Sequence, residues 1–228
     1  MLLAADSQAL LLSIKLGAVT TFLLISFCLP LAGWLSYAPS RLKMILTGFT
    51  TLPLVFPPSV IGFYLLLAFS PQSIFSRVLK YIGIDSLPFS FSGLVVASCI
   101  YSLPFVLQPL QAAFTQIGYR PYEVAATLGV SPWRCWWYGV LPQSRAAILG
   151  AAVIGFAHTL GEFGIVLMIG GNIPGKTQLI SLQIYNHVEA LEYSQANLLA
   201  MILAILTIPA LAISFWLQYR FNRRLHYL

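Results

Sequence analysis

The segment GYRPYEVAATLGVSPWRCWWYGVLP, at residues 118–142, lies between two long apolar runs and contains two helix starts in close succession. Pro121 fits the first position of a helix, where its missing N–H has no partner to lose, and Glu123 complements the positive end of the helix dipole. Gly129 favours the end of that helix, and Ser131-Pro132 favours the start of another. The segment therefore predicts a connection built from two short helices.

The side chains of these two helices indicate different tasks. The first helix carries the small residues Ala125 and Ala126, which we expect along one side, where another protein can approach the backbone closely. The second helix combines an arginine with aromatic rings, a composition that favours the headgroup region of a membrane; its residues are Trp133, Arg134, Trp136, Trp137 and Tyr138. We expect a docking helix held at a fixed height below a membrane, and the alternative is an ordinary amphipathic connector.

The composition of the chain excludes a soluble fold. Of the 228 residues, 59% are hydrophobic and 8% are charged, and the mean hydropathy is +0.85. Soluble domains carry about 25% charged residues. The formal net charge of +6 therefore bears on membrane topology, and we expect membrane lipid rather than nucleic acid as a partner.

The apolar residues fall in runs that reach the roughly 20 residues a membrane-spanning helix needs. The expected spans are 9–37, 44–69, 92–116, 144–169 and 195–219. They predict an all-α polytopic membrane protein with five transmembrane helices, in which residues 1–228 form a single transmembrane domain. The first run is too long for a signal peptide and has no basic region before it, so we expect it to remain as a span.

The basic residues predict the orientation of these spans. With the N-terminus outside, eight lysines and arginines lie on the cytoplasmic side and three lie outside, which the positive-inside rule favours. The eight are Arg41, Lys43, Arg120, Arg134, Arg145, Arg220, Arg223 and Arg224, and the three are Arg77, Lys80 and Lys176. We therefore expect the N-terminus outside, the C-terminus in the cytoplasm and residues 118–142 on the cytoplasmic face.

Prolines interrupt the second expected span. Pro53 and the pair Pro57 and Pro58 each remove a backbone donor, so the helix must kink or unwind where protein or water satisfies the freed carbonyls. Broken membrane helices often line a transport pathway. A kinked helix that only packs in the bundle is the alternative.

The 118–142 segment resembles the EAA loop of the permeases of ABC importers. That motif reads E-A-A, three residues, G, nine residues, I, one residue, L-P, and its glutamate, second alanine, glycine and final L-P fall in register at 123–126, Gly129 and Leu141-Pro142. Val124 replaces the first alanine, and Gly139 stands where isoleucine is usual. In that family the loop is the coupling helix that fits a groove on the ATPase subunit.

Two further segments, 51–67 and 159–177, resemble the corresponding parts of molybdate permeases, with a proline cluster in the first and G-E-F-G and N-I-P-G in the second. The resemblance implies the type I ABC importer permease (MetI-like) fold in a bacterial inner membrane, and a homodimer that performs no covalent chemistry. It also implies two cytoplasmic ABC ATPase subunits, docked on the helix from Glu123 to Gly129, and a periplasmic molybdate-binding protein. Tungstate and sulfate remain alternative cargoes, and a secondary transporter or intramembrane enzyme without an ATPase is the alternative class.

Residues 170–177, GGNIPGKT, match the letters of the phosphate-binding P-loop, but their context argues against nucleotide binding. A P-loop needs a strand before it and a helix after it, so that successive backbone N–H groups face the phosphates. Here a membrane helix is expected before the segment, and Pro174 removes a donor within it. We therefore expect ATP to be handled by a separate subunit, and no cofactor in this chain.

Glu162 is the only acidic residue deep in an expected span, and His158 precedes it by one helical turn, so both share a face. Intramembrane ionisable residues usually face a cavity or a partner. Together with the flanking Gly161 and Gly164, the pair is either part of a gate or hinge, or a buried structural pair. It does not make a catalytic site, since a nucleophile and an H-E-x-x-H pattern are both missing from its surroundings in the sequence.

Other polar residues in the spans are weaker candidates. Ser59, Ser102, Thr50 and Thr51 offer hydroxyl groups to a passing oxyanion, although helix packing is their default role. The cysteines at 28, 99 and 135 have no paired spacing, so we expect neither a disulfide framework nor a metal site.

Two outer segments complete the expected topology. Between the second and third spans, Ser73 caps a short amphipathic helix that Gly83 ends, and this helix lies on the outer surface. Residues 176–194 contain another expected short helix, with His187 among its polar residues. It either receives a substrate-binding protein or caps the bundle.

Overall fold

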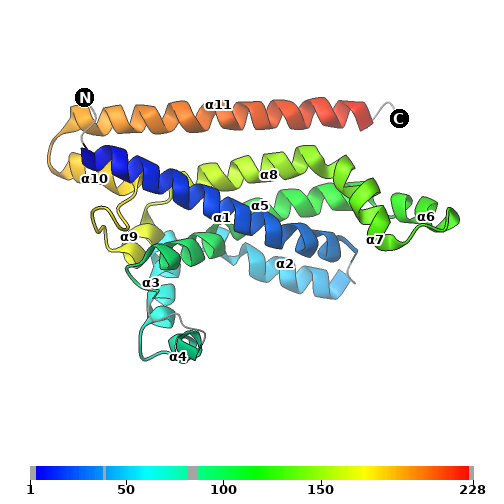
Figure 1. The fold of residues 1–228 in the computed structure, drawn as a ribbon, viewed down its shortest axis with the longest axis horizontal. Coiled ribbons are helices and arrows are strands. Elements are labelled where there is room, and N and C mark those ends of the chain that lie inside the picture. Colours follow the sequence, from blue (N-terminus) through cyan, green and yellow to red (C-terminus); the bar gives the residue numbers. More distant parts are fainter. Residues whose placement is uncertain (1–3, 38–39, 82–86, 226–228) are drawn as a thin grey trace.

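The computed structural model describes residues 4–37, 40–81 and 87–225, and within these ranges every regular element is a helix. The long helices run along one common axis, and the two termini lie at opposite ends of it (Figure 1). They are α1 (Ala4–Tyr37), α2 (Ser40–Val55), α5 (Phe91–Ile117), α8 (Leu141–Gly161) and α11 (Tyr193–Leu225). The all-α prediction is confirmed.

Shorter helices connect or extend the long ones. They are α3 (Pro58–Phe69), α4 (Ile74–Tyr81), α6 (Arg120–Thr127), α7 (Pro132–Cys135), α9 (Gly164–Gly170) and α10 (Ile180–Glu189), with a π-helix, η1, at Trp136–Val140. The outer elements α3, α4, α9 and α10 gather at the end that holds the N-terminus, and α6 and α7 lie at the other end (Figure 1).

Among the described residues, four helices are long and apolar enough to cross a membrane, and a bent pair of helices makes a fifth span. The bent pair is α2 and α3, which meet at 110°. The predicted interruption of the span 44–69 is confirmed at Phe56 and Pro57, where two adjacent prolines remove successive donors and Pro58 begins α3. Pro53, in contrast, lies inside α2 and does not end it.

The expected fourth span is shorter than predicted. The structure ends α8 at Gly161 and starts α9 at Gly164, so Glu162 and Phe163 lie in a break rather than inside a helix. The break is stable because the hydroxyl of Ser181, on α10, donates to the freed carbonyl of Glu162 at 2.6 Å. Ser181 lies 19 residues further along the chain, so the hydrophobic pattern of the span cannot predict this contact.

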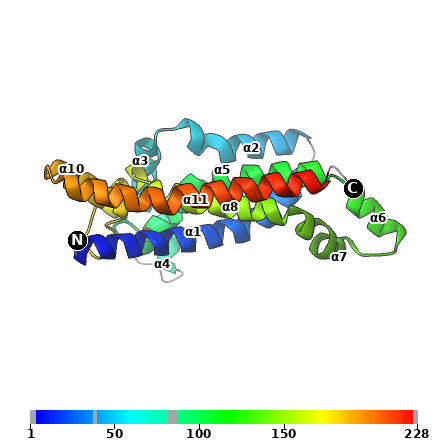
Figure 2. The ribbon, with the colours of Figure 1, turned by 90° about the horizontal axis from the view of Figure 1, so that it is seen from above.

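The core of the bundle is the packing of α1, α5 and α8 on one another, and Figure 2 shows α11 lying over α8 with α1 beside it. One cluster of buried side chains occupies the half next to α6 and includes Leu107, Leu110 and Phe114 of α5. A second cluster occupies the other half and joins α5 to α9 through Leu94 and Ile165. These contacts fix the two ends of α5 relative to α8 and α9.

The outer helix α4 begins as predicted. The Ser73 hydroxyl accepts a hydrogen bond from the backbone N–H of Ser76 at 3.0 Å, which is the contact expected of a helix cap. The predicted end of the helix at Gly83, and residues 82–86 with it, lie outside the described residues.

The start of α5 depends on a glycine. The Ser90 hydroxyl caps the helix by accepting from the N–H of Gly93 at 3.1 Å. A Cβ atom placed on Gly93 would lie 1.9 Å from the backbone oxygen of Leu87, so the chain can enter the helix here only with glycine.

We predict that Gly93→Ala lowers the free energy of unfolding by about 1–3 kcal/mol, because the new methyl group must displace backbone rather than a side chain. Thermal unfolding of the purified protein in detergent measures this. Gly48→Ala on α2 is the matched control, since nothing lies within 4 Å of its Cβ position. Equal melting temperatures for the two variants would contradict the packing argument.

Candidate functional site

The loop between α5 and α8 carries the first candidate site. Its helix α6 begins at Arg120, one residue before the predicted start, and places Pro121 in the first turn. Gly129 follows the helix with φ of +69°, and its N–H donates to Ala126 O at 3.1 Å while the N–H of Val130 donates to Ala125 O at 2.8 Å. This pair of bonds is the Schellman motif, which requires the left-handed conformation that glycine adopts without strain. The predicted stop at Gly129 is confirmed.

The structure contradicts the expectation that Ala125 and Ala126 lie along one side of the helix. Ala125 is 9% exposed and packs in the core cluster that also contains Cys135, whereas Ala126 is exposed. Neighbouring residues of an α-helix point about 100° apart, so consecutive alanines do not share a face. The face of α6 that is open to a partner carries Glu123 and Ala126, and Ala125 holds the helix to its own chain.

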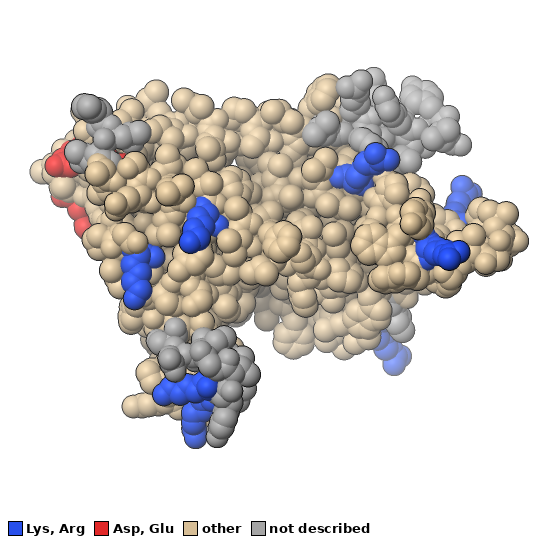
Figure 3. All heavy atoms as spheres, in the orientation of Figure 1, with Lys and Arg blue, Asp and Glu red and all other residues tan. Residues whose placement is uncertain are grey.

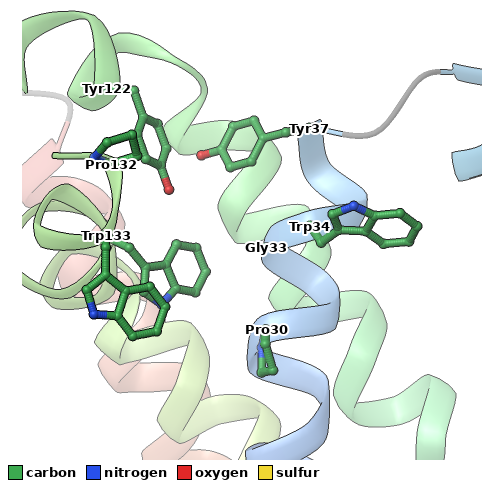
Figure 4. A pocket seen from close by; sticks show the side chains of 8 residues that line it. Pro30, Gly33, Trp34, Tyr37, Tyr122, Pro132 and Trp133 are labelled. Atoms are coloured by element: carbon green, nitrogen blue, oxygen red, sulfur yellow. The ribbon is translucent and has the colours of Figure 1, made fainter. Parts of the chain in front are cut away.

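Aromatic side chains attach α6 to the end of α1. The ring of Tyr37 lies 4.7 Å from that of Tyr119 and 5.4 Å from that of Tyr122. The Tyr37 hydroxyl also donates to Gly118 O at 3.1 Å. Figure 4 shows the hydroxyl groups of Tyr37 and Tyr122 directed toward one another across the gap between α1 and α6. The loop is therefore packed against a spanning helix rather than free in solution.

An apolar groove of about 440 Å³ lies beside these tyrosines, between the end of α1 and α7 (Figure 4). Trp136 closes its floor by packing on Gly33, where a Cβ atom would lie 2.3 Å from the indole ring. The groove is lined by Pro30, Gly33, Trp34, Tyr37, Tyr122, Pro132, Trp133 and Trp136. The remaining aromatic side chains of this segment, Trp137 and Tyr138, are exposed, as expected for a headgroup-level belt.

The second predicted helix of the loop is continuous with the following span. α7 begins after Ser131, whose hydroxyl caps it by accepting from Arg134 N at 3.4 Å, and it passes through the π-helix η1 into α8. Leu141 and Pro142 form the first residues of α8 and are half-buried. Gly139 lies inside η1, and a single π turn of this kind is a local widening of a helix rather than an end. The loop and α8 therefore form one connected piece.

The second candidate site is a polar cluster at the other end of α8. Glu162 is 4% exposed, and its carboxylate accepts from the hydroxyl of Ser98 at 2.5 Å and from that of Ser102 at 2.9 Å. His158 Nδ1 lies 2.9 Å from the Ser102 oxygen and 3.5 Å from Glu162 Oε1. Because an isolated carboxylate in a low-dielectric interior is costly, these donors are what allows Glu162 to be buried.

A cavity of about 620 Å³ opens beside this cluster, where α3, α5, α8 and α9 meet. Gly164 allows α9 to approach α3 closely, since its Cβ position is 3.1 Å from Pro58. Six of the residues singled out in the sequence line the cavity: Pro58, Ser59, His158, Gly161, Glu162 and Gly164. Pro57 is not among the lining residues, and Ser102 lies beneath them as a partner of Glu162. The role of these residues in a pathway or gate stays a prediction.

Sequence reasoning missed several members of this site. Ser98 donates the shortest bond to Glu162, Tyr101 lines the cavity, and the hydroxyl of Thr159 lies 3.3 Å from that of Ser102. The spacing of Ser98 and Ser102, one helical turn apart on the third span, was the available signal. Thr50 and Thr51, in contrast, donate to their own helix backbone at 3.0 and 2.8 Å and lie outside the cluster.

A third cluster joins the first turn of α1 to α10 at the end of the bundle that holds the N-terminus. Asp6 is completely buried, and its Oδ1 atom accepts from Gln183 Nε2 and lies 2.9 Å from His187 Nε2. The other ring nitrogen of His187 lies 2.7 Å from Glu192 Oε2. The hydrogen bond to Asp6 raises the pKa of His187 above its usual value of 6.5, and the bond to Glu192 acts in the same direction. These contacts join residues 176–194 to the first turn of α1, as the expected cap of the bundle requires, and the alternative role of receiving a substrate-binding protein stays a prediction.

The GGNIPGKT segment at 170–177 has no P-loop geometry. The helix α9 precedes it, and the segment folds as turns in which Thr177 donates to Gly170 O at 2.6 Å. Among the described residues, no group of three or more His, Cys, Asp or Glu side chains is arranged to hold a metal ion, and Cys28, Cys99 and Cys135 are free.

Comparison with known proteins places this geometry in a family. Residues 18–227 match the family model described as "Binding-protein-dependent transport system inner membrane component". The chain is 51% identical over 195 residues to the molybdenum transport system permease protein ModB of Azotobacter vinelandii, covering 86% of each chain. It is 31% identical over 182 residues to the sulfate transport system permease protein CysT of Escherichia coli, covering 80% of this chain and 65% of that one.

Solved structures share the fold at low sequence identity. A chain of a bacterial alginate ABC transporter, in complex with its pentasaccharide-bound periplasmic protein, superposes with a TM-score of 0.71 at 17% identity, over 91% of this chain and 76% of that one. A chain of the MetNI methionine ABC transporter in an inward-facing conformation gives 0.65 at 16% identity, over 97% and 95%. The fold is that of type I ABC importer permeases, as predicted.

We predict that Glu162→Ala lowers the free energy of unfolding by about 2–4 kcal/mol, because the buried hydroxyls of Ser98 and Ser102 lose their acceptor. Glu162→Gln keeps an acceptor oxygen and is expected to lose less. Thermal unfolding in detergent measures both, with Ser59→Ala as a control that changes an exposed hydroxyl of the same cavity. A Glu162→Ala variant as stable as Ser59→Ala would contradict the structural account of the cluster.

The raised pKa of His187 gives a pH dependence of stability. Its charged form is stabilised in the folded state, so this contribution is fully present below the unfolded pKa of about 6.5 and is lost as the pH rises through the folded pKa. We expect the melting temperature of the wild type, relative to His187→Gln, to fall as the pH rises above about 6.5. A difference that grows with pH would show the opposite sign and contradict the assignment.

Proposed function

Since the chain belongs to the family of binding-protein-dependent transport system inner membrane components, we propose that it is the permease subunit of an ATP-driven importer for molybdate. The observation that supports molybdate as the cargo is the 51% identity to a molybdenum transport permease across 86% of both chains. The subunit provides the passage through the membrane and performs no covalent chemistry. ATP is hydrolysed by two separate cytoplasmic subunits, and a periplasmic molybdate-binding protein delivers the anion.

The loop at 118–142 is the element that receives the ATPase. Glu123 and Ala126 are exposed on α6, and Glu123 lies in its first turn, where a carboxylate also interacts favourably with the helix dipole. The opposite side of α6 is fixed by buried Ala125 and by the tyrosine contacts to α1. A partner that moves α6 therefore moves the ends of α1 and α8 with it.

The orientation that this assignment requires has the N-terminus outside and the C-terminus in the cytoplasm. On the face drawn in Figure 3, basic atoms are visible at both ends of the molecule, and acidic atoms only at the end that carries α10. The support for the orientation is therefore the eight-to-three count of basic residues in the sequence. It supports a cytoplasmic position for α6 and an outer position for the Asp6 cluster.

A homodimer completes the pathway. One chain offers a cavity of about 620 Å³ beside Glu162, and a two-fold related copy supplies the facing wall. ATP-driven closure of the two ATPase subunits brings the two α6 helices together and rocks the spans between inward-open and outward-open states. The break at Glu162 and Phe163, with Gly161 and Gly164 beside it, is the point at which α8 and α9 change their relative angle.

Tungstate and sulfate are the alternative cargoes, since they share charge and tetrahedral shape with molybdate. A relative named as a sulfate permease supports the second of these, at lower identity and over a smaller share of its own chain. A secondary transporter is the alternative class, and it predicts transport by this chain alone. Proteoliposomes that contain the chain with and without the ATPase, the binding protein and ATP separate the two classes.

We predict that replacing Glu123 and Gly129 together by alanine abolishes co-purification of the ATPase subunit and ATP-dependent molybdate uptake in proteoliposomes. The change removes the exposed carboxylate and strains the turn that ends α6, which costs about 1 kcal/mol for a left-handed residue with a Cβ. Pull-down of the ATPase by the tagged permease measures the first effect.

The matched control for this double variant lies at the opposite end of the molecule. Gly175 has φ of +70° and is followed by the exposed Lys176, so replacing both by alanine alters the same backbone conformation and one charge. The control is expected to retain the ATPase. Retention by the Glu123 and Gly129 variant as well would show that the ATPase docks elsewhere.

A further inference from the structure

A further cavity, of about 780 Å³, lies between α2 and α5 at the end of the bundle that leads into α6, and both apolar and polar side chains line it. Its polar lining consists of Lys43 and Thr47 from α2 and Gln108, Gln111, Thr115 and Gln116 from α5. The sequence analysis used Lys43 only as a marker of orientation, and it gave the three glutamines no role.

This concentration of polar groups on membrane helices requires contact with water. Amide and ammonium groups in contact with hydrocarbon are expensive, so such residues face a partner or a water-filled cavity. Other side chains of α2 that the structure describes are apolar and exposed, such as Ile45 and Phe49, and they suit lipid or a second copy of the chain. The polar side of α2 faces α5, and the groove between them is where water and a polar solute can stay.

The chemistry of the lining suits an anion. The ammonium and amide groups are donors, and none of the lining residues is acidic. Lys43 Nζ donates to Thr115 Oγ1 at 3.4 Å, and no ion pair joins it to a carboxylate among the residues that the structure describes. A long bond to one hydroxyl leaves the other ammonium protons available to a ligand.

One face of α5 connects this cavity with the cavity beside Glu162. Tyr101 lines the cavity beside Glu162, and Gln108 and Thr115 line the cavity between α2 and α5. These three residues follow one another at steps of seven residues, or about two helical turns. At 1.5 Å per residue, Gln108 lies about 10 Å along the helix from Tyr101. Phe105 falls between them, and its ring stacks on that of His158 with centroids 3.8 Å apart.

We propose that the cavity between α2 and α5 is the exit site for the transported oxyanion, and that Lys43 is the residue that selects for negative charge there. This inference rests on the proposed function. The anion leaves the cavity at Glu162, passes the stack of Phe105 on His158, and enters the Lys43 cavity before it reaches the cytoplasm. The carboxylate of Glu162, held by hydroxyl donors, makes the cavity beside it a poor resting place for an anion, and Lys43 provides an attractive charge in the cavity between α2 and α5.

A lysine suits an exit site, where the ion must be released, better than it suits a site of tight binding. Conduction requires contacts that are strong enough to draw the ion in and weak enough to release it. A hydrated ammonium group at an open cavity supplies attraction without the bidentate geometry by which arginine holds oxyanions.

The test uses the complete complex of permease, ATPase and binding protein in proteoliposomes, with the initial rate of ATP-dependent molybdate uptake and the ATPase rate measured together. Lys43→Gln is expected to reduce uptake about tenfold, because a dianion loses its attraction to a nearby cation in a wet site. Lys43→Arg is expected to keep at least half of the uptake, and Lys43→Glu to lose more than Lys43→Gln. The ATPase rate, stimulated by the binding protein, stays within twofold of the wild type, so the loss appears as fewer ions moved per ATP.

Arg41→Gln is the matched control, since Arg41 is exposed on the same helix, carries the same charge and does not line the cavity. Uptake by Lys43→Gln equal to that of Arg41→Gln would overturn the assignment of the exit site while the wild type still transports molybdate. A wild-type complex that moves no molybdate would instead overturn the proposed cargo, and the role of Lys43 with it.

Discussion

A continuous helix from Pro132 to Gly161 connects the loop at residues 118–142 with the polar cluster at Glu162, and the rest of the structure depends on that continuity. At 1.5 Å per residue its 30 residues measure about 45 Å, enough to cross a bilayer and reach beyond one face. The π turn in η1 widens the rod without ending it. We propose that a displacement of the loop reaches the far end of α8 as a movement of one body.

The two ends of this rod are anchored differently. At the loop, burial of Ala125 and the tilted and edge-on contacts of the tyrosine rings tie α6 to α1 by packing, which is insensitive to charge. At the other end, the helix stops where the Glu162 carboxylate binds two hydroxyls of α5, and where its carbonyl binds Ser181. A few directional bonds hold that end, whereas packing holds the other.

The sequence predicted the features that are set locally. The stop at Gly129 follows from one backbone conformation, and the bend after Phe56 follows from two adjacent prolines. It could not predict the break at Glu162, because the groups that satisfy it come from α5 and α10. For the same reason the burial of Asp6 escaped notice, since its partner His187 is 181 residues away. The prediction that Ala125 and Ala126 lie along one side of α6 was wrong. Neighbouring residues of an α-helix point about 100° apart, so the sequence alone was enough to exclude it.

Distances between spin labels on Thr127 of α6 and Leu149 of α8 test the rod most directly, in the assembled complex with and without bound ATP; both positions are exposed. Dimers with one labelled subunit report the distance within a chain, and dimers labelled only at Thr127 report the distance between chains. The account predicts that ATP shortens the distance between chains and leaves the distance within each chain unchanged. A change of similar size within the chain would mean that the loop moves independently of α8, and would contradict the account.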